Sequence, residues 1–537
     1  MNTLLLPRPN VLSTLSGSYE LSVGATVSGP ADLADAVRRA LPILDLRPGD
    51  TGAIDVRVDP SLGEEAYRLV VGSRGVEITA GGRAGAFYAA QSLHQLLPDA
   101  TYRSAVPAES WVVPGVRVED APAHTWRGLH VDVARHFLPK REVLRVIDLM
   151  AVHKLNRLHL HLVDDQGWRV ESRAYPRLQE VASHRTRTAT NYHREEPAYD
   201  GIPHGGYYTL DDLAEIAQYA RAREVVVVPE IDVPGHASAI LAAYPELGAT
   251  GERFEVLDRW GISPAILSPL PPTVDFLTTI FDELLGALGA TPYVHIGGDE
   301  CVLDDWEASA EISAYRESLG LADVGELHAW FLRRLADVLA ERGARAVVWD
   351  EAFVSGALRQ DTLVMPWRGM GVGRRAAAAG HEVVATPVFP LYFDYAEAAS
   401  ADEPMAIGDT ITVTDVASFE PAPASWEPGE RERVVGLQGQ LWSERISDAR
   451  TLDYRAWPRA CALAEVAWGG EAGSDFMDRL ERHLGRLDAL GVEYRPQAGP
   501  LPWQRRRPHR PSRVQVAAAM EHLDEMTLSA TSTRPSI

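Results

Sequence analysis

The segment Tyr293-Val-His-Ile-Gly-Gly-Asp-Glu300 joins a short apolar run to two glycines and two adjacent carboxylates. The run 293–296 is typical of a buried strand, and the glycines permit a sharp turn and the close approach of another group. Asp299 and Glu300 therefore follow the C-terminal end of an expected strand, which is where parallel α/β proteins carry their functional groups. Because neighbouring side chains of an extended segment point in different directions, these two carboxylates can have different tasks.

The chain around this segment alternates short apolar strands with amphipathic helices from Pro122 onward. Helices are expected at 140–153, 210–221, 274–288, 325–339 and 452–468, and strands at 129–133, 157–163, 225–228, 293–296, 346–349, 363–367, 382–385 and 434–441. An acidic, aromatic or histidine residue lies near the C-terminal end of each strand. This pattern predicts an α/β fold, a (β/α)8 TIM barrel over residues 121–496. The alternative is a doubly wound open sheet, which would gather its functional residues at one switch point instead.

The segments on either side of the expected barrel have a different character. Residues 1–120 predict a small α+β N-terminal domain with strands at 19–27, 53–58, 66–71 and 75–79 and helices at 32–41 and 82–97. No catalytic constellation stands out there, which favours a packing role. From residue 497 the chain becomes basic and proline-rich and then rich in serine and threonine. That composition predicts a disordered tail over 497–537.

Composition and charge exclude several classes of function. The 537 residues carry a formal net charge of −23, so nucleic acid and anionic membrane are not expected as partners. The two cysteines, Cys301 and Cys461, provide neither a disulfide framework nor a cysteine cluster for zinc or iron–sulfur. The first residues lack a charged segment followed by a long apolar run. The expectation is a cytoplasmic protein, or a secreted one if the true start lies upstream, and the oligomeric state stays open.

The residues at the other strand ends are typical of a sugar-binding pocket. Arg135 follows the first strand, Asp164 the second and His236 the third. Each alone is as compatible with a structural role. The later strand ends add three tryptophans and further polar groups, namely Trp349, Trp367, Tyr392, Asp394, Trp442 and Glu444. Together they predict a small cup with aromatic walls and carboxylates that bind the hydroxyl groups of one polar ring.

Taken in order, these motifs resemble those of the glycoside hydrolase family 20 β-N-acetylhexosaminidases. The resemblance covers residues 1 to about 495 and rests on Asp132-Val-Ala-Arg135-His136, Leu162-Val-Asp164-Asp-Gln-Gly-Trp168, Glu230-Ile-Asp-Val-Pro-Gly-His236, His295-Ile-Gly-Gly-Asp299-Glu300, Trp349-Asp-Glu, Tyr392-Phe-Asp394 and Trp442-Ser-Glu444. One departure is Phe419, where members of the family often carry tryptophan. That difference bears on the preference for the leaving group (the aglycone) and not on the hydrolysis reaction itself.

The resemblance implies a retaining exo-glycosidase that removes terminal β-linked N-acetylhexosamine through an oxazolinium intermediate. Glu300 would be the acid/base, Asp299 would hold the 2-acetamido group of the substrate, and Tyr392 would donate to its oxygen. The nucleophile then belongs to the substrate, an exception to the scheme with two enzyme carboxylates. The resemblance also implies that hydroxyl groups are bound by Arg135, Asp394 and Glu444, that the walls are Trp349, Trp367 and Trp442, and that Asp164 and His236 flank the acid/base. No cofactor and no metal are implied.

Two other interpretations stay open. A metal-dependent TIM-barrel hydrolase would use a divalent cation held by Asp164, His236, His295, Asp299 and Glu300. A non-catalytic carbohydrate-binding protein would use the same pocket without the chemistry. The residues favour neither, because aromatic side chains crowd the expected mouth and both Asp299 and Glu300 are present. They do not choose between the gluco and galacto configurations, nor do they identify the natural substrate.

Overall fold

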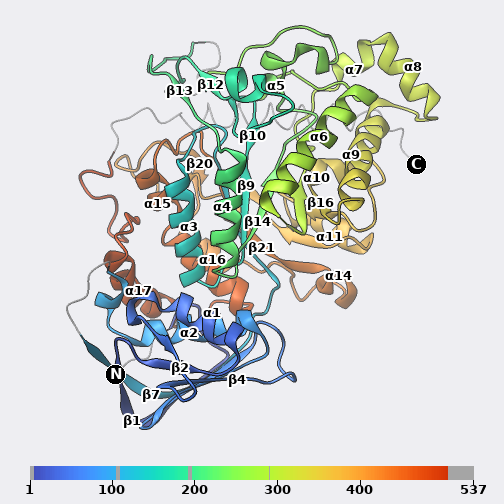
Figure 1. Ribbon diagram of the computed structural model, residues 1–537. Helices are drawn as coiled ribbons and strands as arrows, with labels where there is room; N and C mark the ends of the chain where they lie inside the picture. Colours follow the sequence, from blue (N-terminus) through green and yellow to red (C-terminus); the bar gives the residue numbers. More distant parts are fainter. Residues whose placement is uncertain (1–4, 104–108, 192–195, 290, 506–537) are drawn as a thin grey trace.

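The computed structural model describes residues 5–103, 109–191, 196–289 and 291–505. The N-terminal part is a seven-stranded sheet in the order β1-β7-β5-β6-β4-β2-β3. Helices α1 (Ala31–Ala40) and α2 (Arg83–Leu96) lie between this sheet and the rest of the molecule (Figure 1). The strands are β1 (Val11–Ser22), β2 (Thr26–Ser28), β3 (Arg47–Pro48), β4 (Ile54–Val58), β5 (Tyr67–Gly72), β6 (Gly75–Ala80) and β7 (Ser110–Asp120).

Two strands of this sheet differ from the expectation. The strand predicted at 19–27 is divided, because the chain turns at Gly24, whose φ of +74° suits glycine. The long strand β7 was not predicted, although it pairs with both β1 and β5. Its sequence contains Pro114, which reads as a strand breaker because it lacks a backbone N–H. The structure accommodates Pro114 opposite Ser18, at the register shift between Thr14 and Ser18 of β1.

The second part is a closed barrel of eight parallel strands, in the order β14-β15-β16-β17-β18-β21-β8-β9. The closed ring confirms the predicted (β/α)8 architecture and excludes the open sheet. All eight expected strands are present, with bounds that differ by a few residues at most. They are β8 (Trp126–Asp132), β9 (Arg157–His161), β14 (Val226–Glu230), β15 (Tyr293–His295), β16 (Arg345–Trp349), β17 (Leu363–Met365), β18 (Val383–Ala385) and β21 (Val434–Leu441).

Helices surround the barrel (Figure 1). The main ones are α3 (Lys140–Val152), α4 (Leu210–Arg221), α6 (Pro271–Leu288), α9 (Val324–Ala340), α11 (Met370–Ala378), α15 (Ala449–Ala456), α16 (Arg459–Gly469) and α17 (Phe476–Ala489). The single helix predicted at 452–468 is wrong, because the chain breaks between α15 and α16. Pro458 disfavours helical backbone at the residue before it, and Trp457 is extended with φ −109° and ψ 136°.

Shorter elements decorate the loops at the C-terminal ends of the barrel strands and the links between helices. They are β10 (Val163–Asp164), β11 (Gly167–Trp168), β12 (His184–Arg185), β13 (His204–Gly205), β19 (Tyr395–Ala396), β20 (Ile407–Thr410), α5 (Ser238–Ala243), α7 (Asp304–Ala308), α8 (Ala310–Ser318), α10 (Asp350–Ser355), α12 (Val388–Leu391), α13 (Val413–Ala417) and α14 (Pro428–Glu432). None of the helices in the described ranges has the length and hydropathy needed to cross a bilayer.

The start of the predicted tail is attached to the end of the barrel. The indole of Trp503 donates to Glu493 at 3.0 Å, and the amide of Gln504 donates to the backbone oxygens of Glu493 and Tyr494. Apart from Arg505, the basic segment of the tail lies in 506–537, outside the described residues.

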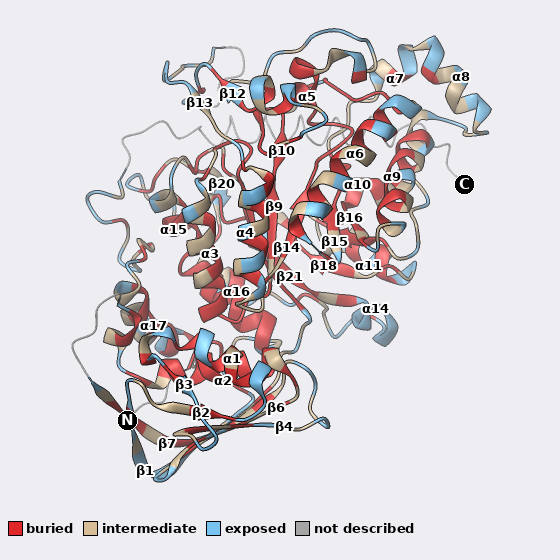
Figure 2. Ribbon diagram, viewed as in Figure 1, coloured by how far each residue is buried: buried red, intermediate tan, exposed pale blue. Residues whose placement is uncertain are grey.

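The strands of the barrel are largely buried (Figure 2), and their inward side chains form an apolar part and a polar part. One cluster of buried side chains is formed by Trp126, Val228, Val347, Trp349, Leu363, Met365 and Val384. Toward the C-terminal ends of the strands the inward positions are instead polar and fully buried, with His130, His159, His161, Glu230 and His295. Buried polar groups must be paired to be tolerated, so the pairing within this layer restricts the positions of the side chains at the strand ends above it.

A buried ion pair joins the N-terminal sheet to the barrel. Lys154, after α3, lies 2.9 Å from the carboxylate of Asp120 at the end of β7, and both side chains are almost fully buried. The same carboxylate accepts from the hydroxyl of Tyr67 at 2.7 Å and from the indole of Trp468 at 2.9 Å. Three groups from separate elements thus meet at Asp120, which fixes the position of the sheet on the barrel.

We expect Lys154→Met to lower the free energy of unfolding by about 3–5 kcal/mol, because it leaves the Asp120 carboxylate buried without its cation. Lys140→Met is the matched control, since Lys140 pairs with Asp212 and Glu215 at the surface, where an ion pair contributes little to stability. Denaturant titration of both variants measures the two losses. Equal losses would show that the buried pair does not hold the two parts together.

Candidate active site

The turn after β15 places Asp299 and Glu300 at the C-terminal end of the barrel. Gly297 and Gly298 have φ values of +65° and +97°. A Cβ atom on Gly297 would overlap the carboxylate of Asp232, so glycine is required there for space as well as for conformation. Glu300 itself has a φ of +51°, which is uncommon for a residue with a side chain and is found at functional sites. The turn therefore orients the two adjacent carboxylates differently.

His236 lies between two pairs of carboxylates. Its Nδ1 is 3.3 Å from Asp164 and 3.5 Å from Asp165, and its Nε2 is 3.7 Å from Asp299 and 3.5 Å from Glu300. Burial lowers the pKa of His236, but the surrounding carboxylates, Asp164 first, outweigh burial and hold that pKa well above its usual value. His236 is therefore a cation that supports the four acids around it.

Asp299 has a perturbed titration. Burial raises the pKa of Asp299 to about 6, and the charge of Glu300 acts in the same direction while His236 opposes both. The side chain of Asp299 is 12% exposed and that of Glu300 21%. Two acids that follow each other in sequence thus lie in different surroundings, which is typical of carboxylates with separate roles.

Arg135 is held by its neighbours and not by solvent. Its guanidinium lies 2.7 Å from Asp164 and 3.3 Å from Asp132, and its Nε donates to the side-chain oxygen of Gln166 at 3.0 Å. The guanidinium carbon is 5.0 Å from the ring centroid of Trp442. Arg135 is therefore fixed in direction at the mouth of the barrel, where it can offer its remaining N–H groups to a ligand.

Several buried carboxylate oxygens at this end have no hydrogen-bond partner among the described residues. Asp299, Asp394 and Glu444 each carry one, and others are on Asp165, Asp232 and Asp350. Burial raises the pKa of Glu444 and, together with Glu444 itself, holds the pKa of Asp394 well above its usual range. A buried polar atom without a partner costs roughly 1–3 kcal/mol. These acceptors are therefore suited to hydroxyl or N–H donors from a ligand.

The predicted aromatic residues lie around the same place. The ring of Trp442 is 5.8 Å from Trp349 and 6.2 Å from Tyr392, centroid to centroid. Trp349 is only 1% exposed, so it forms the floor more than a wall. Trp367 and Trp442 are half-buried against the cluster that contains Trp349. The indole of Trp367 donates to Glu351 at 2.9 Å.

Phe419, the departure from the family pattern, lies after α13 and is half-buried against the main core. Part of its ring stays exposed.

Sequence analysis missed the layer beneath the pocket. Glu230 accepts from the indole of Trp349 at 2.8 Å and lies 2.5 Å from His161, which in turn lies 2.9 Å from Asp164. The available signal was the pattern His159-x-His161 followed by acids, because alternate positions of a strand share a face. Those histidines are buried inside the barrel with Glu230, although the segment 157–163 resembles an ordinary apolar strand.

The donor set at this site disfavours the metal-dependent alternative. Asp164 faces the Arg135 guanidinium and two imidazoles, and the pKa values of His161 and His236 are both held well above the usual range, by Glu230 and by Asp164 respectively, against the effect of burial. A protonated imidazole presents N–H groups, while a metal ligand needs a lone pair. The groups that surround Asp164 therefore already neutralise it.

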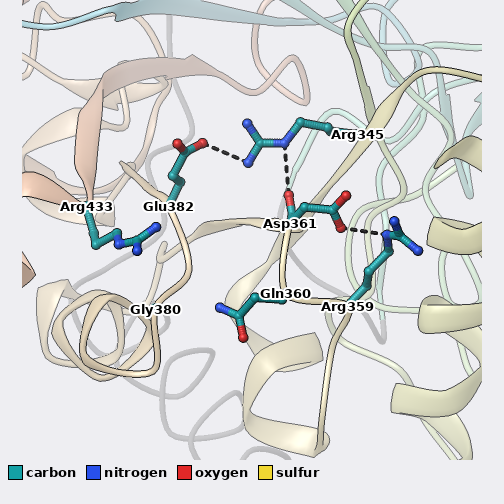
Figure 3. Close-up of a pocket in the computed structure, with 7 residues that line it drawn as sticks. All are labelled: Arg345, Arg359, Gln360, Asp361, Gly380, Glu382 and Arg433. Atoms are coloured by element: carbon teal, nitrogen blue, oxygen red, sulfur yellow. Dashed lines mark hydrogen bonds and ion pairs between the residues drawn. The ribbon is translucent and has the colours of Figure 1, made fainter.

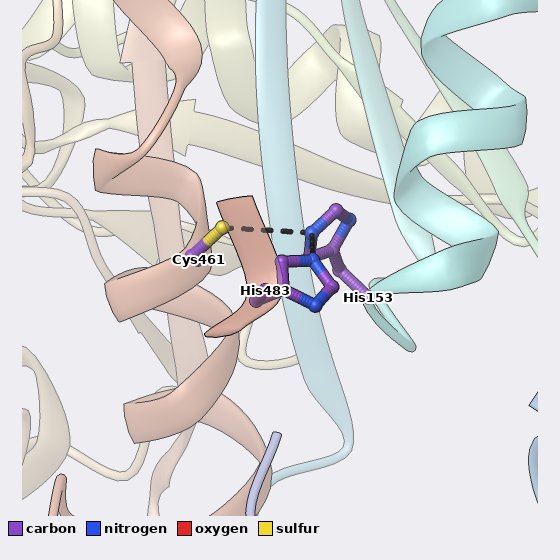
Figure 4. A group of neighbouring side chains, drawn as sticks. All are labelled: His153, Cys461 and His483. Carbon is purple, nitrogen blue, oxygen red and sulfur yellow. Dashed lines mark hydrogen bonds between the residues drawn. The ribbon is translucent and has the colours of Figure 1, made fainter. Parts of the chain in front are cut away.

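A separate cluster of His153, Cys461 and His483 lies far from the barrel mouth, between α3, α16 and α17 (Figure 4). Arg486 donates to His483 Nδ1 at 3.1 Å, His483 Nε2 lies 2.9 Å from His153 Nε2, and His153 Nδ1 lies 2.6 Å from the oxygen of Leu149. One proton on each histidine satisfies this chain, and burial lowers the pKa of His153 to about 4. Both cysteines are free thiols. The hydrogen bonds explain the cluster without a cation.

A hollow of about 650 Å³ opens at the opposite end of the barrel, before the starts of β16, β17, β18 and β21 (Figure 3). Arg345 pairs with Glu382 and Arg359 with Asp361, each at 2.7 Å. Charges that neutralise one another in this way are typical of a stabilising surface network, and the N-terminal end of a barrel is not where its chemistry lies.

The comparisons with known proteins agree with this geometry. Residues 124–471 match the family model for the catalytic domain of glycosyl hydrolase family 20, and residues 2–121 match the model for domain 2 of that family. A beta-hexosaminidase of Porphyromonas gingivalis is 36% identical over 91% of this chain, and the match spans 64% of that protein. A beta-N-acetylhexosaminidase of Cellulomonas fimi is 34% identical over 91% of this chain and 95% of its own length.

Solved structures show the same likeness. A family 20 exo-beta-N-acetylglucosaminidase of Vibrio harveyi, solved with N-acetylglucosamine, superposes with a TM-score of 0.81 at 30% identity, over 92% of this chain and 79% of that one. The beta-N-acetylhexosaminidase of Streptomyces coelicolor gives a TM-score of 0.77 at 29% identity, over 93% and 99% of the two chains. With both of its domains matched in order, the chain belongs to glycosyl hydrolase family 20.

Proposed function

We propose that the protein is a retaining exo-glycosidase that removes terminal β-linked N-acetylhexosamine by substrate-assisted catalysis. The observation that carries this proposal is the set of buried carboxylate oxygens without a partner, on Asp299, Asp394 and Glu444, at the mouth of a barrel lined by indole rings. One small ring with several hydroxyl groups and an amide offers donors for all three. The names of the relatives, beta-N-acetylhexosaminidase among them, support the same substrate class.

The reaction follows from the positions of Asp299 and Glu300. Glu300 donates its proton to the glycosidic oxygen as the bond from that oxygen to the anomeric carbon breaks. The carbonyl oxygen of the 2-acetamido group attacks the anomeric carbon and forms an oxazolinium ion. Asp299 accepts the amide N–H and stabilises the positive charge that develops on that nitrogen. Tyr392 donates to the acetamido oxygen and holds it in line for attack.

The second half of the reaction returns the enzyme to its starting state. The Glu300 carboxylate now accepts a proton from water, whose oxygen attacks the anomeric carbon and opens the oxazolinium ring. Two displacements at the same carbon leave the product with its original β configuration. His236, a cation within 4 Å of both acids, limits the repulsion between Asp299 and Glu300 while their protonation states change.

The remaining polar groups bind the sugar. Arg135, with two carboxylates already fixing its direction, offers N–H groups, while Asp394 and Glu444 offer acceptors to vicinal hydroxyl groups. Trp442 presents a half-buried indole face, which suits the apolar face of a pyranose. Trp349 and Trp367 complete the enclosure. The leaving group extends past the rim, and we expect Phe419, the departure from the family pattern, to affect the preference for it.

The first test compares substrates. If the acetamido group is the nucleophile, a chromogenic N-acetyl-β-glucosaminide or N-acetyl-β-galactosaminide should be hydrolysed at least about 1000-fold faster than the plain β-glucoside, since the oriented internal nucleophile is absent from the glucoside. Initial rates at matched concentrations measure the ratio. Comparable rates for the glucoside would contradict the proposal, and inhibition by a chelator would favour a metal-dependent hydrolase.

The second test separates the two acids. Glu300→Gln should lose about 100-fold or more in kcat on a glycan with a poor leaving group, because general acid catalysis is removed, and much less in the first step on an activated aryl glycoside. Asp299→Asn should be slow on both, because it no longer orients or neutralises the acetamido group. Stopped-flow kinetics on both substrates provide the comparison. A glycosyl azide of inverted configuration formed in added azide would instead reveal an enzyme carboxylate as the nucleophile.

The third test is the pH dependence of kcat/KM, which reports on the free enzyme. Asp299 acts in its ionised form, and its pKa is raised to about 6 by burial. On the acid side of the profile, activity should therefore fall about tenfold per pH unit below that pH. The residual activity of Asp299→Asn should lack this acid limb. An acid limb that persists unchanged in the variant would assign it to another group.

A further inference from the structure

His161, the last residue of β9, is fully buried beneath the pocket and touches a carboxylate with each ring nitrogen. Its Nδ1 lies 2.5 Å from Glu230 and its Nε2 lies 2.9 Å from Asp164. The two acids come from different elements, Glu230 from the end of β14 and Asp164 from the hairpin strand β10. The ring therefore joins the end of β14 to the hairpin that follows β9, the neighbouring strand of the barrel.

The partners of these carboxylates determine the charge of the ring. Glu230 also accepts from the indole of Trp349, and Asp164 is paired with the Arg135 guanidinium at 2.7 Å, so both acids are ionised and can only accept hydrogen bonds. A neutral imidazole has one N–H, and its other nitrogen would direct a lone pair at a carboxylate oxygen. Both ring nitrogens of His161 therefore carry protons. Glu230 and Asp164 indeed hold the pKa of His161 well above its usual value, although burial alone would lower it.

We propose that His161 is a positioning residue of the active site, a buried imidazolium that links the orientation of Trp349 to that of His236 and Arg135. The link runs through Glu230 on one side and through Asp164 on the other. This inference rests on the proposed function, because the groups it positions are those assigned to sugar binding and to the support of the acids.

The two sides of the bridge act on different parts of the reaction. Glu230 fixes the indole of Trp349, so the side of His161 that faces Glu230 sets the floor on which the sugar lies. Asp164 is 3.3 Å from His236 Nδ1, and the opposite nitrogen of His236 faces Asp299 and Glu300. The side of His161 that faces Asp164 therefore fixes the position of the His236 imidazolium behind Asp299 and Glu300. Loss of either contact should affect binding and turnover unequally.

Other charged or titratable groups also influence His161. Trp442 packs its ring edge-on at 5.0 Å, and His130 lies 5.7 Å away, centroid to centroid. The titratable groups whose charges act on His161, or on which His161 acts, are Glu230, Asp164, Asp132, Asp232, His130 and His159. Carboxylates dominate this set. Burial, together with its histidine neighbours, lowers the pKa values of His130 and His159 and keeps both of them neutral.

The first experiment needs no variant. In the wild-type enzyme labelled with ¹⁵N-histidine, two imidazole rings, His161 and His236, should show protons on both nitrogens, with shifts that stay constant from about pH 6 to about pH 9, beyond the normal range of histidine titration. The ring assigned to His161 is the one whose signals disappear in His161→Gln. If the signals lost in that variant belong to a neutral ring, the proposed imidazolium bridge does not exist.

The second experiment divides the bridge. An asparagine amide at position 161 replaces the donor of Nδ1, and a glutamine amide replaces the donor of Nε2. His161→Asn should keep the contact to Glu230 and lose that to Asp164, so kcat should fall about 100-fold, as expected when catalytic groups are misplaced, with KM little changed. His161→Gln should keep Asp164 in place and loosen Trp349, so KM should rise about tenfold with a smaller loss in kcat.

His159→Gln is the matched control, because His159 lies on the same strand, is equally buried and is 3.0 Å from Glu230, but does not bridge to Asp164. Both kcat and KM of His159→Gln should stay close to the wild-type values. Equal losses in both parameters for all three variants would reduce His161 to a structural residue. Failure of the wild type to hydrolyse N-acetyl-β-glucosaminide would overturn the proposed function instead, while the labelled histidine signals would still report on the bridge.

Discussion

The structure depends on Asp164, a fully buried carboxylate on which three cationic groups converge. Arg135, His161 and His236 each reach it within 3.3 Å, and together they hold its pKa well below the usual range, although burial would raise it. A buried charge is tolerated only when it is paired. Each cation therefore keeps its place because Asp164 is there, and each has a different role. Arg135 binds the sugar, His161 holds Glu230 and thereby Trp349, and His236 neutralises Asp299 and Glu300.

This arrangement explains why the barrel interior is divided. Toward the N-terminal ends of the strands, Trp126, Val347 and Leu363 pack as an ordinary apolar core. Toward the C-terminal ends, Glu230 and its histidines replace that core. The replacement lowers the stability that apolar packing would provide, since buried ion pairs seldom exceed hydrophobic residues in stabilising a fold. What the polar layer provides is orientation, because hydrogen bonds fix the direction of Trp349 and His236 in a way that apolar contacts do not.

The order of strands and helices was predictable because each barrel strand carries its own local signal. The valines of β14 correctly predict a buried strand, and the glycines after β15 correctly predict a sharp turn. What failed depended on partners far away in sequence. Pro114 is accepted in β7 only because the opposing strand β1 shifts its register there. In the site, residues in the loops just past the strand ends were recognised. His161 and Glu230, the last residues of β9 and β14, were not, because their role arises from pairing between strands.

The pair Asp299 and Glu300 shows how adjacent residues acquire different chemistry. After β15 the backbone turns through two glycines, and Glu300 has a left-handed conformation. The side chains of Asp299 and Glu300 therefore diverge more than the side chains of two neighbouring residues in an extended strand would. Asp299 enters the more enclosed place, where burial raises its pKa to about 6, and Glu300 stays nearer to the opening. An acid that must exchange protons with a leaving group and with water needs that access. The other must be ionised beside a developing cation, and the His236 imidazolium favours that state at neutral pH.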